Sequence, residues 1–239
     1  MCVPRAGLAG RRLPRGPKCN AMHILAIFLV VAVEASTLIF GGYNFSVKSG
    51  IGGPGPNLFS PDNAFVNSST GDLTLVLTQD SATGRWGCGE VVLNHSLGFG
   101  TYSWLVEAPL ESFDKGIVLG LFTYENDSRE IDIELSSWDN LYPGVNADFA
   151  VQPSTVKRFW ASGDILALSY TWSPGRVDFE CGGVSWSHTG EDVPPPGGER
   201  VHMNLWLFRG LSPATDKGVT VLVRNFSFSP LPREGEGSS

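Results

Sequence analysis

Short apolar runs, each about the length of a β-strand, follow one another along most of this 239-residue chain and are separated by turn-forming residues. Examples are LTLVL at 73–77, TYSWLVEA at 101–108 and GIVLGLFTY at 116–124, and a typical breaker is Ser173-Pro174-Gly175. No stretch keeps a helical period for longer than a turn or two, which argues against a helical architecture. Many short strands at such spacing are typical of a β-sandwich or β-barrel, often as one domain at this length. The sequence therefore predicts an all-β fold.

Aromatic residues make up 11% of the chain and include seven tryptophans. This content is sufficient for a sizeable core and leaves some aromatic rings for other uses. Such rings can stack on the faces of sugars, although packing in a core or at its rim is the more common use. Composition alone leaves both uses open.

The first 35 residues have the pattern of a secretory signal peptide. An apolar run at 24–33 is followed by small residues that fit a cleavage site, and the run is too short to span a bilayer comfortably. Basic residues precede this run: Arg5, Arg11, Arg12, Arg15 and Lys18. An uncleaved anchor and a translation start at Met22 remain alternatives. The predicted organisation is a signal peptide at 1–35, a β-sandwich domain at 36–232 and a disordered polar tail at 233–239.

The charge of the chain is acidic and becomes more so without the predicted signal peptide. The full chain has 17 basic and 24 acidic residues, and the segment 1–35 holds five of the basic and one of the acidic residues. The remainder has 12 basic and 23 acidic residues, a net charge of −11. This balance argues against nucleic acid and against an anionic membrane surface as partners.

Two cysteines, Cys88 and Cys181, remain after the predicted signal peptide. In a secreted chain these two residues can form one disulfide, although the sequence does not show whether they meet. The histidines of the same part are scattered, without the spacing of metal ligands: His95, His188 and His202. The sequence also contains no nucleophile elbow and no glycine-rich phosphate loop. We therefore expect no metal and no cofactor.

Five N-x-S sequons fit a secreted eukaryotic glycoprotein, located outside the cell or in a cell wall. No apolar tail follows the last of them, which argues against a C-terminal lipid anchor and against membrane attachment after signal cleavage. The predicted glycosylation sites are Asn44, Asn67, Asn94, Asn126 and Asn225.

The segment REIDIEL, at 129–135, places three carboxylates at a spacing of two. In a strand, Glu130, Asp132 and Glu134 share one face, while Ile131 and Ile133 share the other. The isoleucines are therefore expected in the core, and the carboxylates on the opposite surface, where like charges repel. One interpretation is a solvated acidic face that Lys or Arg of neighbouring strands neutralises. The preceding strand supplies almost no cations, which counts against that interpretation.

Glycoside hydrolysis gives the same pattern a chemical purpose. Retaining glycosidases use two carboxyl groups about 5–5.5 Å apart, one as the nucleophile and one as the acid/base. Residues four apart on a strand have Cα atoms roughly 13 Å apart, and two glutamates leaning inward over a concave sheet close much of that gap. An aspartate between them separates the pKa values of the group, so that one carboxyl stays protonated while another ionises.

EIDIE resembles the E-[ILV]-D-x-E signature of glycoside hydrolase family 16. That family includes laminarinases, lichenases, agarases, carrageenases and xyloglucan transglycosylases, on a concanavalin-like β-jelly roll. The similarity extends in family order over about 59–230. Further segments that resemble the family are WGCGE at 86–90, GFGTY at 98–102, GIV at 116–118, LFTY at 121–124, WSPG at 172–175 and HMNLW at 202–206. The resemblance implies a jelly-roll sandwich of two antiparallel sheets with a concave carbohydrate-binding cleft.

The resemblance also implies roles for individual residues. Glu130 corresponds to the nucleophile, Glu134 to the general acid/base and Asp132 to the residue that assists both. The residues implied to bind sugar are Glu90, Asn204 and Trp206. Tyr124 and Trp138 are candidates for the cleft lining, with core or rim packing as the alternative for each.

Departures from the family pattern keep two functions open. Ser128 stands where lichenases have Trp, the strand VNADFAVQ lacks their Asn-Tyr-Tyr cluster, and the motif lacks the extra residue of laminarinases. One hypothesis is a secreted retaining endo-glycosidase that hydrolyses or transglycosylates a β-linked polysaccharide, such as a β-glucan or a galactan, by double displacement. The other is a catalytically inactive, lectin-like carbohydrate-binding protein on the same fold. The polymer, its linkage and the oligomeric state are left open.

Overall fold

The computed structural model describes residues 36–232 of the chain. The predicted signal peptide at 1–35 and the predicted tail at 233–239 lie outside the described residues. The described part consists of β-strands with four short 3-10 helices, which confirms the all-β prediction. The 3-10 helices are η1 (Pro61–Asn63), η2 (Leu110–Ser112), η3 (Trp138–Asn140) and η4 (Phe208–Gly210). Within residues 36–232, no helix has the length and apolar character needed to cross a membrane.

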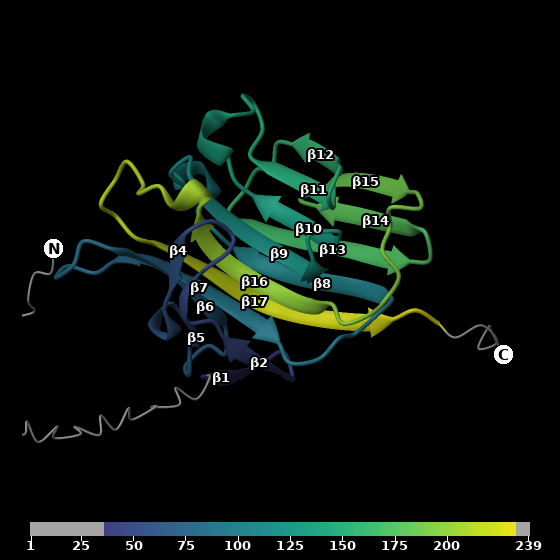
Figure 1. Ribbon diagram of the computed structural model, residues 1–239, viewed down its shortest axis with the longest axis horizontal. Helices are drawn as coiled ribbons and strands as arrows, with labels where there is room; N and C mark the ends of the chain where they lie inside the picture. Colours follow the sequence, from purple (N-terminus) through teal and green to yellow (C-terminus); the bar gives the residue numbers. More distant parts are fainter. Residues whose placement is uncertain (1–35, 233–239) are drawn as a thin grey trace, which may run out of the picture. The chain divides into compact units, whose positions relative to one another are not determined.

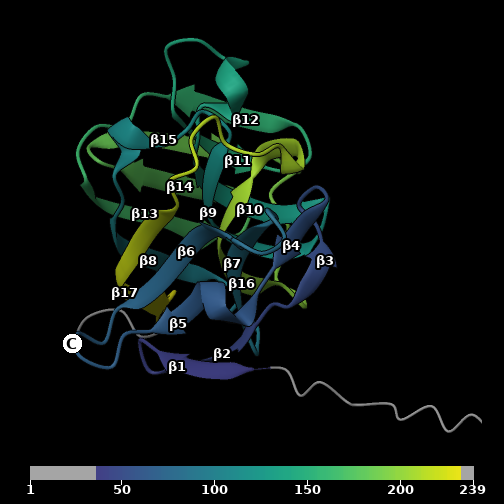
Figure 2. The same cartoon turned by 90° about the vertical axis from the view of Figure 1, so that its left-hand side faces the viewer.

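The first sheet carries the predicted acidic strand near one end. Its spatial order is β1-β2-β7-β16-β9-β10-β11-β12, and every neighbouring pair is antiparallel. Both views place β12 at the opposite end of this sheet from β1 and β2 (Figures 1 and 2). Its strands are β1 (Thr37–Phe40), β2 (Tyr43–Val47), β7 (Trp86–Leu93), β9 (Ile117–Asn126), β10 (Arg129–Leu135), β11 (Ala147–Val151), β12 (Thr155–Phe159) and β16 (Arg200–Leu207).

The second sheet forms the other layer of the sandwich (Figure 1). Its spatial order is β5-β6-β17-β8-β13-β14-β15, again with antiparallel neighbours. Some neighbouring strands in each sheet, such as β9 with β16 and β8 with β17, come from distant parts of the chain, as in a jelly roll. The strands are β5 (Ala64–Val66), β6 (Leu73–Gln79), β8 (Gly100–Glu107), β13 (Ile165–Ser173), β14 (Arg176–Cys181), β15 (Val184–Thr189) and β17 (Val219–Pro230).

A hairpin and a small two-stranded ribbon both involve β7. Strands β6 and β7 pair at Thr78 with Gly87 and at Gln79 with Trp86, so the chain passes from one layer to the other through this hairpin. A small ribbon of β3 (Gly50–Gly52) and β4 (Asn57–Phe59) also lies against β7, through a parallel pairing. This ribbon brings the segment between β3 and β4 to the side of β7.

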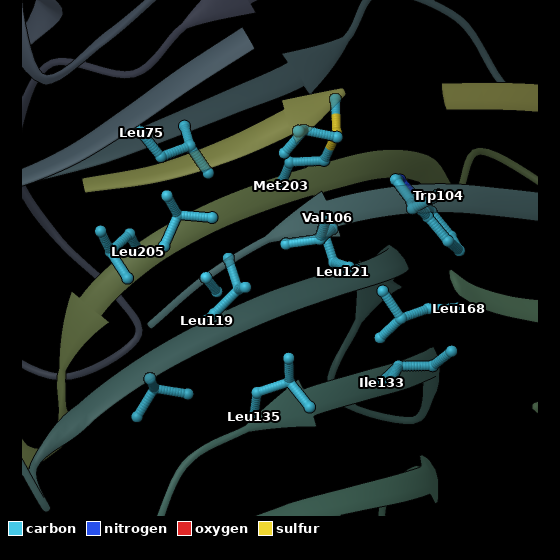
Figure 3. Packing of buried hydrophobic residues seen from close by; sticks show 14 of the residues in the cluster. Leu75, Trp104, Val106, Leu119, Leu121, Ile133, Leu135, Leu168, Met203 and Leu205 are labelled. Carbon is cyan, nitrogen blue, oxygen red and sulfur yellow. The ribbon is translucent and has the colours of Figure 1, made fainter. Parts of the chain in front are cut away.

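The hydrophobic core fills the space between the two layers (Figure 3). The first sheet contributes Leu119, Leu121, Ile133, Leu135, Met203 and Leu205, and the second contributes Leu75, Trp104, Val106 and Leu168. The isoleucines of β10, Ile131 and Ile133, are fully buried, as the alternation predicts. Each such side chain contributes about 1.5–3 kcal/mol to folding. Burying them forces the carboxylates of β10 onto the other face of the sheet.

The predicted disulfide between Cys88 and Cys181 is wrong, since both cysteines are free and buried. Cys88 lies in β7 of the first sheet and Cys181 in β14 of the second, on strands that do not pair with each other. Both side chains belong to the hydrophobic core, where burial raises the pKa of each thiol to about 12. Each cysteine therefore acts as a small apolar side chain.

Candidate active site

The register of β10 and β9 places the three carboxylates on the outer face of the first sheet. Glu130 lies opposite Tyr124, Asp132 opposite Phe122 and Glu134 opposite Gly120. Directly paired residues of antiparallel strands project to the same face. The same rows continue into β16, where His202 pairs with Phe122 and Asn204 pairs with Gly120. Sequence segments more than 70 residues apart thus form one polar surface.

A cavity of about 400 Å³ lies over this surface. Four of the predicted site residues line it: Glu90, Glu130, Glu134 and Asn204. Tyr124 also lines the cavity, in accordance with the first of its two predicted placements. The remaining lining residues are Lys48, Gly53, Pro54, Phe122, Asp127 and His202.

Three predicted residues lie outside the lining. Asp132 is buried between the two glutamates and is only 3% exposed. Trp206 follows Asn204 on the same face of β16, is 7% exposed, and its indole N–H has no hydrogen-bond partner among residues 36–232. Trp138 is buried just after β10 and packs against Tyr142. A role of Trp206 in sugar binding stays a prediction.

The three carboxylates of β10 have no cationic partner in the described part of the chain. No ion pair there involves Glu130, Asp132 or Glu134. Gln152 donates a hydrogen bond from Nε2 to Asp132 Oδ2 at 3.1 Å, while the other oxygen of Asp132 has no partner there. The interpretation of β10 as an acidic face neutralised by neighbouring Lys or Arg is therefore not supported.

Burial and mutual repulsion raise the pKa of each member of this group. Burial raises the pKa of Glu130 to about 7, against a hydrogen bond with Asp132 that lowers it. The pKa of Asp132 is raised by burial and then by the charges of Glu130 and Glu134. The pKa of Glu134 is raised by burial and then by Asp148 and Glu130, against a hydrogen bond with Trp138. The group therefore retains protons near neutral pH and titrates as a unit.

A strained turn follows β10 and carries Trp138. Trp138, Asp139 and Asn140 all have positive φ, at 42°, 56° and 59°, a conformation that non-glycine residues rarely adopt. Ser136 Oγ accepts a hydrogen bond from the Trp138 backbone N–H at 2.9 Å, which holds the start of the turn. Strain of this kind is concentrated at functional sites. Here the turn places the Trp138 side chain within hydrogen-bonding reach of Glu134.

Asp148 of β11 is a fourth carboxylate that the sequence interpretation missed. It pairs directly with Glu134 and is 5% exposed, and burial raises its pKa to about 7. Its nearest cation is Arg158 of β12, with Nε 4.0 Å from Oδ2. The available signal was the alternation in VNADFAV, which predicts one outward polar residue on the strand beside β10. Asp148 therefore adds negative charge next to Glu134.

Glu90 interacts with Lys48 and His202, two residues that the sequence did not indicate as part of the site. Lys48 Nζ lies 2.7 Å from Oε2 and His202 Nδ1 lies 2.8 Å from Oε1. The ring of His202 stacks on Phe122 at 4.9 Å between centroids. Lys48 and His202 both line the cavity beside Glu90. A ligand at this end therefore meets an ion-paired cluster rather than a free carboxylate.

Asn204 has a side chain that is buried without protein partners. It is 1% exposed, and neither its amide oxygen nor its amide nitrogen has a hydrogen-bond partner within residues 36–232. Gly120, on the next strand, makes room for it, since a Cβ there would lie 2.5 Å from Asn204 Oδ1. Buried amides are normally hydrogen-bonded. The amide group of Asn204, with two N–H donors and one acceptor oxygen beside the cavity, matches the hydroxyl groups of a sugar.

The described residues contain no cluster of side chains arranged as metal ligands. Among them, no group of three or more His, Cys, Asp or Glu side chains is placed to hold a metal ion. The chemistry that these residues offer is that of paired carboxyl groups with different proton affinities.

A scan against protein-family models finds no match, and a search of curated proteins by sequence finds none either. Solved structures do match. A Bacillus licheniformis β-glucanase has 19% identity and a TM-score of 0.61, over 77% of this chain and 91% of that one. A Bacteroides ovatus family 16 glycoside hydrolase in complex with a product oligosaccharide has 10% identity and a TM-score of 0.61, over 77% and 94%.

A third match is described as a pseudo β-1,3-glucanase and immunostimulatory antigen of Mycobacterium tuberculosis. It has 20% identity and a TM-score of 0.59, over 75% of this chain and 88% of that one. Together with the strand orders above, these likenesses define a β-jelly roll, and the carboxylate-lined cavity of this structure lies on the outer face of the first sheet. This is the fold of glycoside hydrolase family 16, as the EIDIE resemblance predicts.

Proposed function

We propose that this protein is a retaining glycoside hydrolase that acts on a β-linked glucan. The observation that carries the proposal is the pair Glu130 and Glu134, which line one cavity with the buried Asp132 between them and with no cation on any of the three among the described residues. Unneutralised, partly buried carboxyls destabilise a fold, and their raised pKa values are typical of catalytic acids and bases.

The proposed reaction begins with Glu130 as the nucleophile. Its ionised carboxylate attacks the anomeric carbon of the sugar in the cavity, while protonated Glu134 donates its proton to the leaving glycosidic oxygen. The bond between the anomeric carbon and that oxygen breaks, and a covalent glycosyl ester on Glu130 forms. Glu134 then takes a proton from water or from an acceptor hydroxyl, which attacks the ester and releases Glu130. The product keeps its anomeric configuration.

The pKa values support this division of roles. Glu134 is surrounded by Asp148 and Glu130, and its pKa is raised well above the ordinary value, which favours the protonated acid. Burial raises the pKa of Glu130 to about 7, so part of this carboxyl is ionised near neutral pH and can act as the nucleophile. Asp132 lies between them and receives the hydrogen bond of Gln152, and its pKa is raised by burial and by the charges of both glutamates.

The charge of the cavity favours a neutral substrate. Its lining contains the carboxyls of Asp127, Glu130 and Glu134, whereas Glu90 is already paired with Lys48 and His202. Sulfated or uronic chains would meet repulsion from Asp127 and from ionised Glu130, and a neutral glucan would not. The β-glucanases with the same fold agree with this preference. We therefore rank β-glucans above carrageenans as substrates.

A panel of polymers tests the proposal directly. Release of reducing ends is measured on laminarin, lichenan, xyloglucan, agarose and carrageenan, for the wild type and for Glu130→Gln and Glu134→Gln. We expect activity on at least one neutral β-glucan, and a loss of about 10³-fold or more in each variant. Proton NMR of the first product reports its anomeric configuration. Full turnover by Glu130→Gln would refute the assigned nucleophile.

A lectin-like protein on the same fold remains the second candidate. The specific support is the similar structure named as a pseudo β-1,3-glucanase, together with the missing Asn-Tyr-Tyr cluster on β11. If the protein releases no reducing ends from any of the polymers but still binds oligosaccharides in calorimetry, this alternative is established.

We also propose that the protein is secreted and N-glycosylated. Asn44, Asn94, Asn126 and Asn225 are exposed and Asn67 is partly exposed, so the sequons are accessible to modification. The assay is expression in eukaryotic cells, followed by treatment of the culture medium with an N-glycosidase. We expect the protein in the medium and a fall in apparent mass on treatment. Retention in the cell at unchanged mass would contradict this proposal.

A further inference from the structure

The outer face of the first sheet continues beyond β10, on the side away from the cavity. Glu134 pairs with Asp148 of β11, and Asp148 pairs in turn with Arg158 of β12. These three side chains therefore project to one face. The cavity is lined from the other direction, by residues of β9, β16 and β7. Glu134 thus stands between the cavity and the surface over β11 and β12.

Exposed aromatic rings and a cation lie on this second surface. The guanidinium of Arg158 stacks over the ring of Tyr142 at 3.6 Å, and Tyr142 is 39% exposed. Phe159, at the end of β12, is in the core at 7% exposed, whereas the next residue, Trp160, is 58% exposed. Alternation therefore puts Trp160 on the face of Arg158. We call these three side chains the Tyr142–Arg158–Trp160 platform.

Trp160 is the most exposed of the large aromatic side chains in the described part of the chain. A tryptophan buries a large apolar area when it has a partner, and a stacked pair of arginine and tyrosine offers both donors and an apolar plane. The Nε atom of Arg158 is buried and lies 4.0 Å from Asp148 Oδ2. The platform thus presents two aromatic rings and a guanidinium group that lies beside the carboxyl of Asp148.

We propose that the Tyr142–Arg158–Trp160 platform binds the sugar on the leaving-group side of the scissile bond. This inference rests on the proposed function, because it takes Glu134 as the proton donor. A donor must lie beside the oxygen that links the two sugars, so one sugar occupies the cavity and the next extends over β11 and β12. The ligand is a glycosyl unit of a neutral β-glycan: its C–H face stacks on Trp160 or Tyr142, and its hydroxyls accept from Arg158.

The test compares two substrates that differ only on the leaving-group side. A glucan oligosaccharide places sugars over the platform, whereas an aryl glycoside of the same donor sugars places only a phenol there. We expect Trp160→Ala to lower kcat/KM for the oligosaccharide about tenfold more than for the aryl glycoside, the size of one lost aromatic contact. Trp160→Tyr should recover most of the difference. Phe65→Ala, an exposed ring on β5 of the other sheet at 44% exposed, is the matched control.

Direct binding keeps the inference separate from the catalytic proposal. Calorimetry on Glu134→Gln, with and without Trp160→Ala, measures the affinity for glucan oligosaccharides of increasing length. The expected result is a loss of about tenfold that appears only for chains long enough to pass Glu134. If the wild type cleaves neither substrate, the proposed function is refuted. The calorimetric measurements still show whether the platform binds a sugar. Equal losses on both substrates, unchanged affinity, or a dimer that depends on Trp160 would overturn the inference.

Discussion

Replacing Glu130 with glutamine should stabilise the protein at neutral and alkaline pH while it abolishes the proposed activity. Burial raises the pKa of Glu130 from 4.5 to about 7 in the folded state. Below the lower value both states hold the proton, and stability is unaffected. Between the two values the unfolded chain has released a proton that the folded chain keeps, so the free energy of unfolding falls as pH rises.

The size of the effect follows from those two pKa values. Each pH unit between them contributes about 1.4 kcal/mol, so the penalty reaches at most about 3 kcal/mol above pH 7. Glutamine has nearly the same shape and carries no charge, so Glu130→Gln removes this penalty. It also removes one source of repulsion on Asp132 and Glu134, whose pKa values Glu130 raises. The variant should therefore gain stability at pH 8 and gain none at pH 4.

Urea unfolding and thermal scans at pH 4 and pH 8 measure this difference. For a domain of this size, a gain of about 3 kcal/mol corresponds to a rise in Tm of roughly 6–12 °C. Glu111→Gln, at an exposed position in η2, is the matched control and should change little at either pH. A variant that is no more stable than the wild type at pH 8, or equally stabilised at both pH values, would refute the argument from buried charge.

Further variants report on the other groups around the cavity. Asp148→Asn removes the charge opposite Glu134 and lowers the pKa of that acid, so the alkaline limb of the kcat profile should move to lower pH. Asn204→Ala should lower kcat/KM roughly tenfold in steady-state kinetics without a loss in Tm, because its amide has no partner among the described residues. Ile133→Ala should cost about 2–4 kcal/mol in urea unfolding, since Ile133 is fully buried in the core.

The side of the sheet on which each β10 side chain lies could be predicted, because it depends only on the alternation of residues within the strand. Alternation alone assigns Ile131 and Ile133 to the core and the carboxylates to the opposite face, and the burial of the two isoleucines confirms it. The succession of short strands also predicts the all-β class without any knowledge of the pairing. The jelly-roll order of strands came from the resemblance, since neighbours such as β9 and β16 are about 80 residues apart in sequence.

The surroundings of the carboxylates were not predictable, because they depend on pairing between distant segments. Nothing near Asp148 in the sequence indicates that it faces Glu134, and only the register of β10 and β11 brings the two together. Lys48 and His202 meet at Glu90 for the same reason, from β16 and from the residue after β2. The disulfide prediction failed for the same reason. The sequence does not show that Cys88 and Cys181 lie on strands of different sheets.

In the described part of the chain, the carboxylates of β10 lack the charged partners that a buried carboxylate such as Glu90 has, and this difference points to a functional site. Away from β10 and the adjacent Asp148, buried carboxylates in the described chain have partners: Glu90 has Lys48 and His202, and Glu199 accepts from Ser96, Gly98 and Gly197. The carboxyls of β10 repel one another and have no cation among the described residues, and their only other contacts of this kind are with the side chains of Gln152 and Trp138. A chain under pressure for stability alone would replace one of them or add a cation nearby. Three such groups beside one cavity are explained if a substrate, rather than the protein, interacts with them.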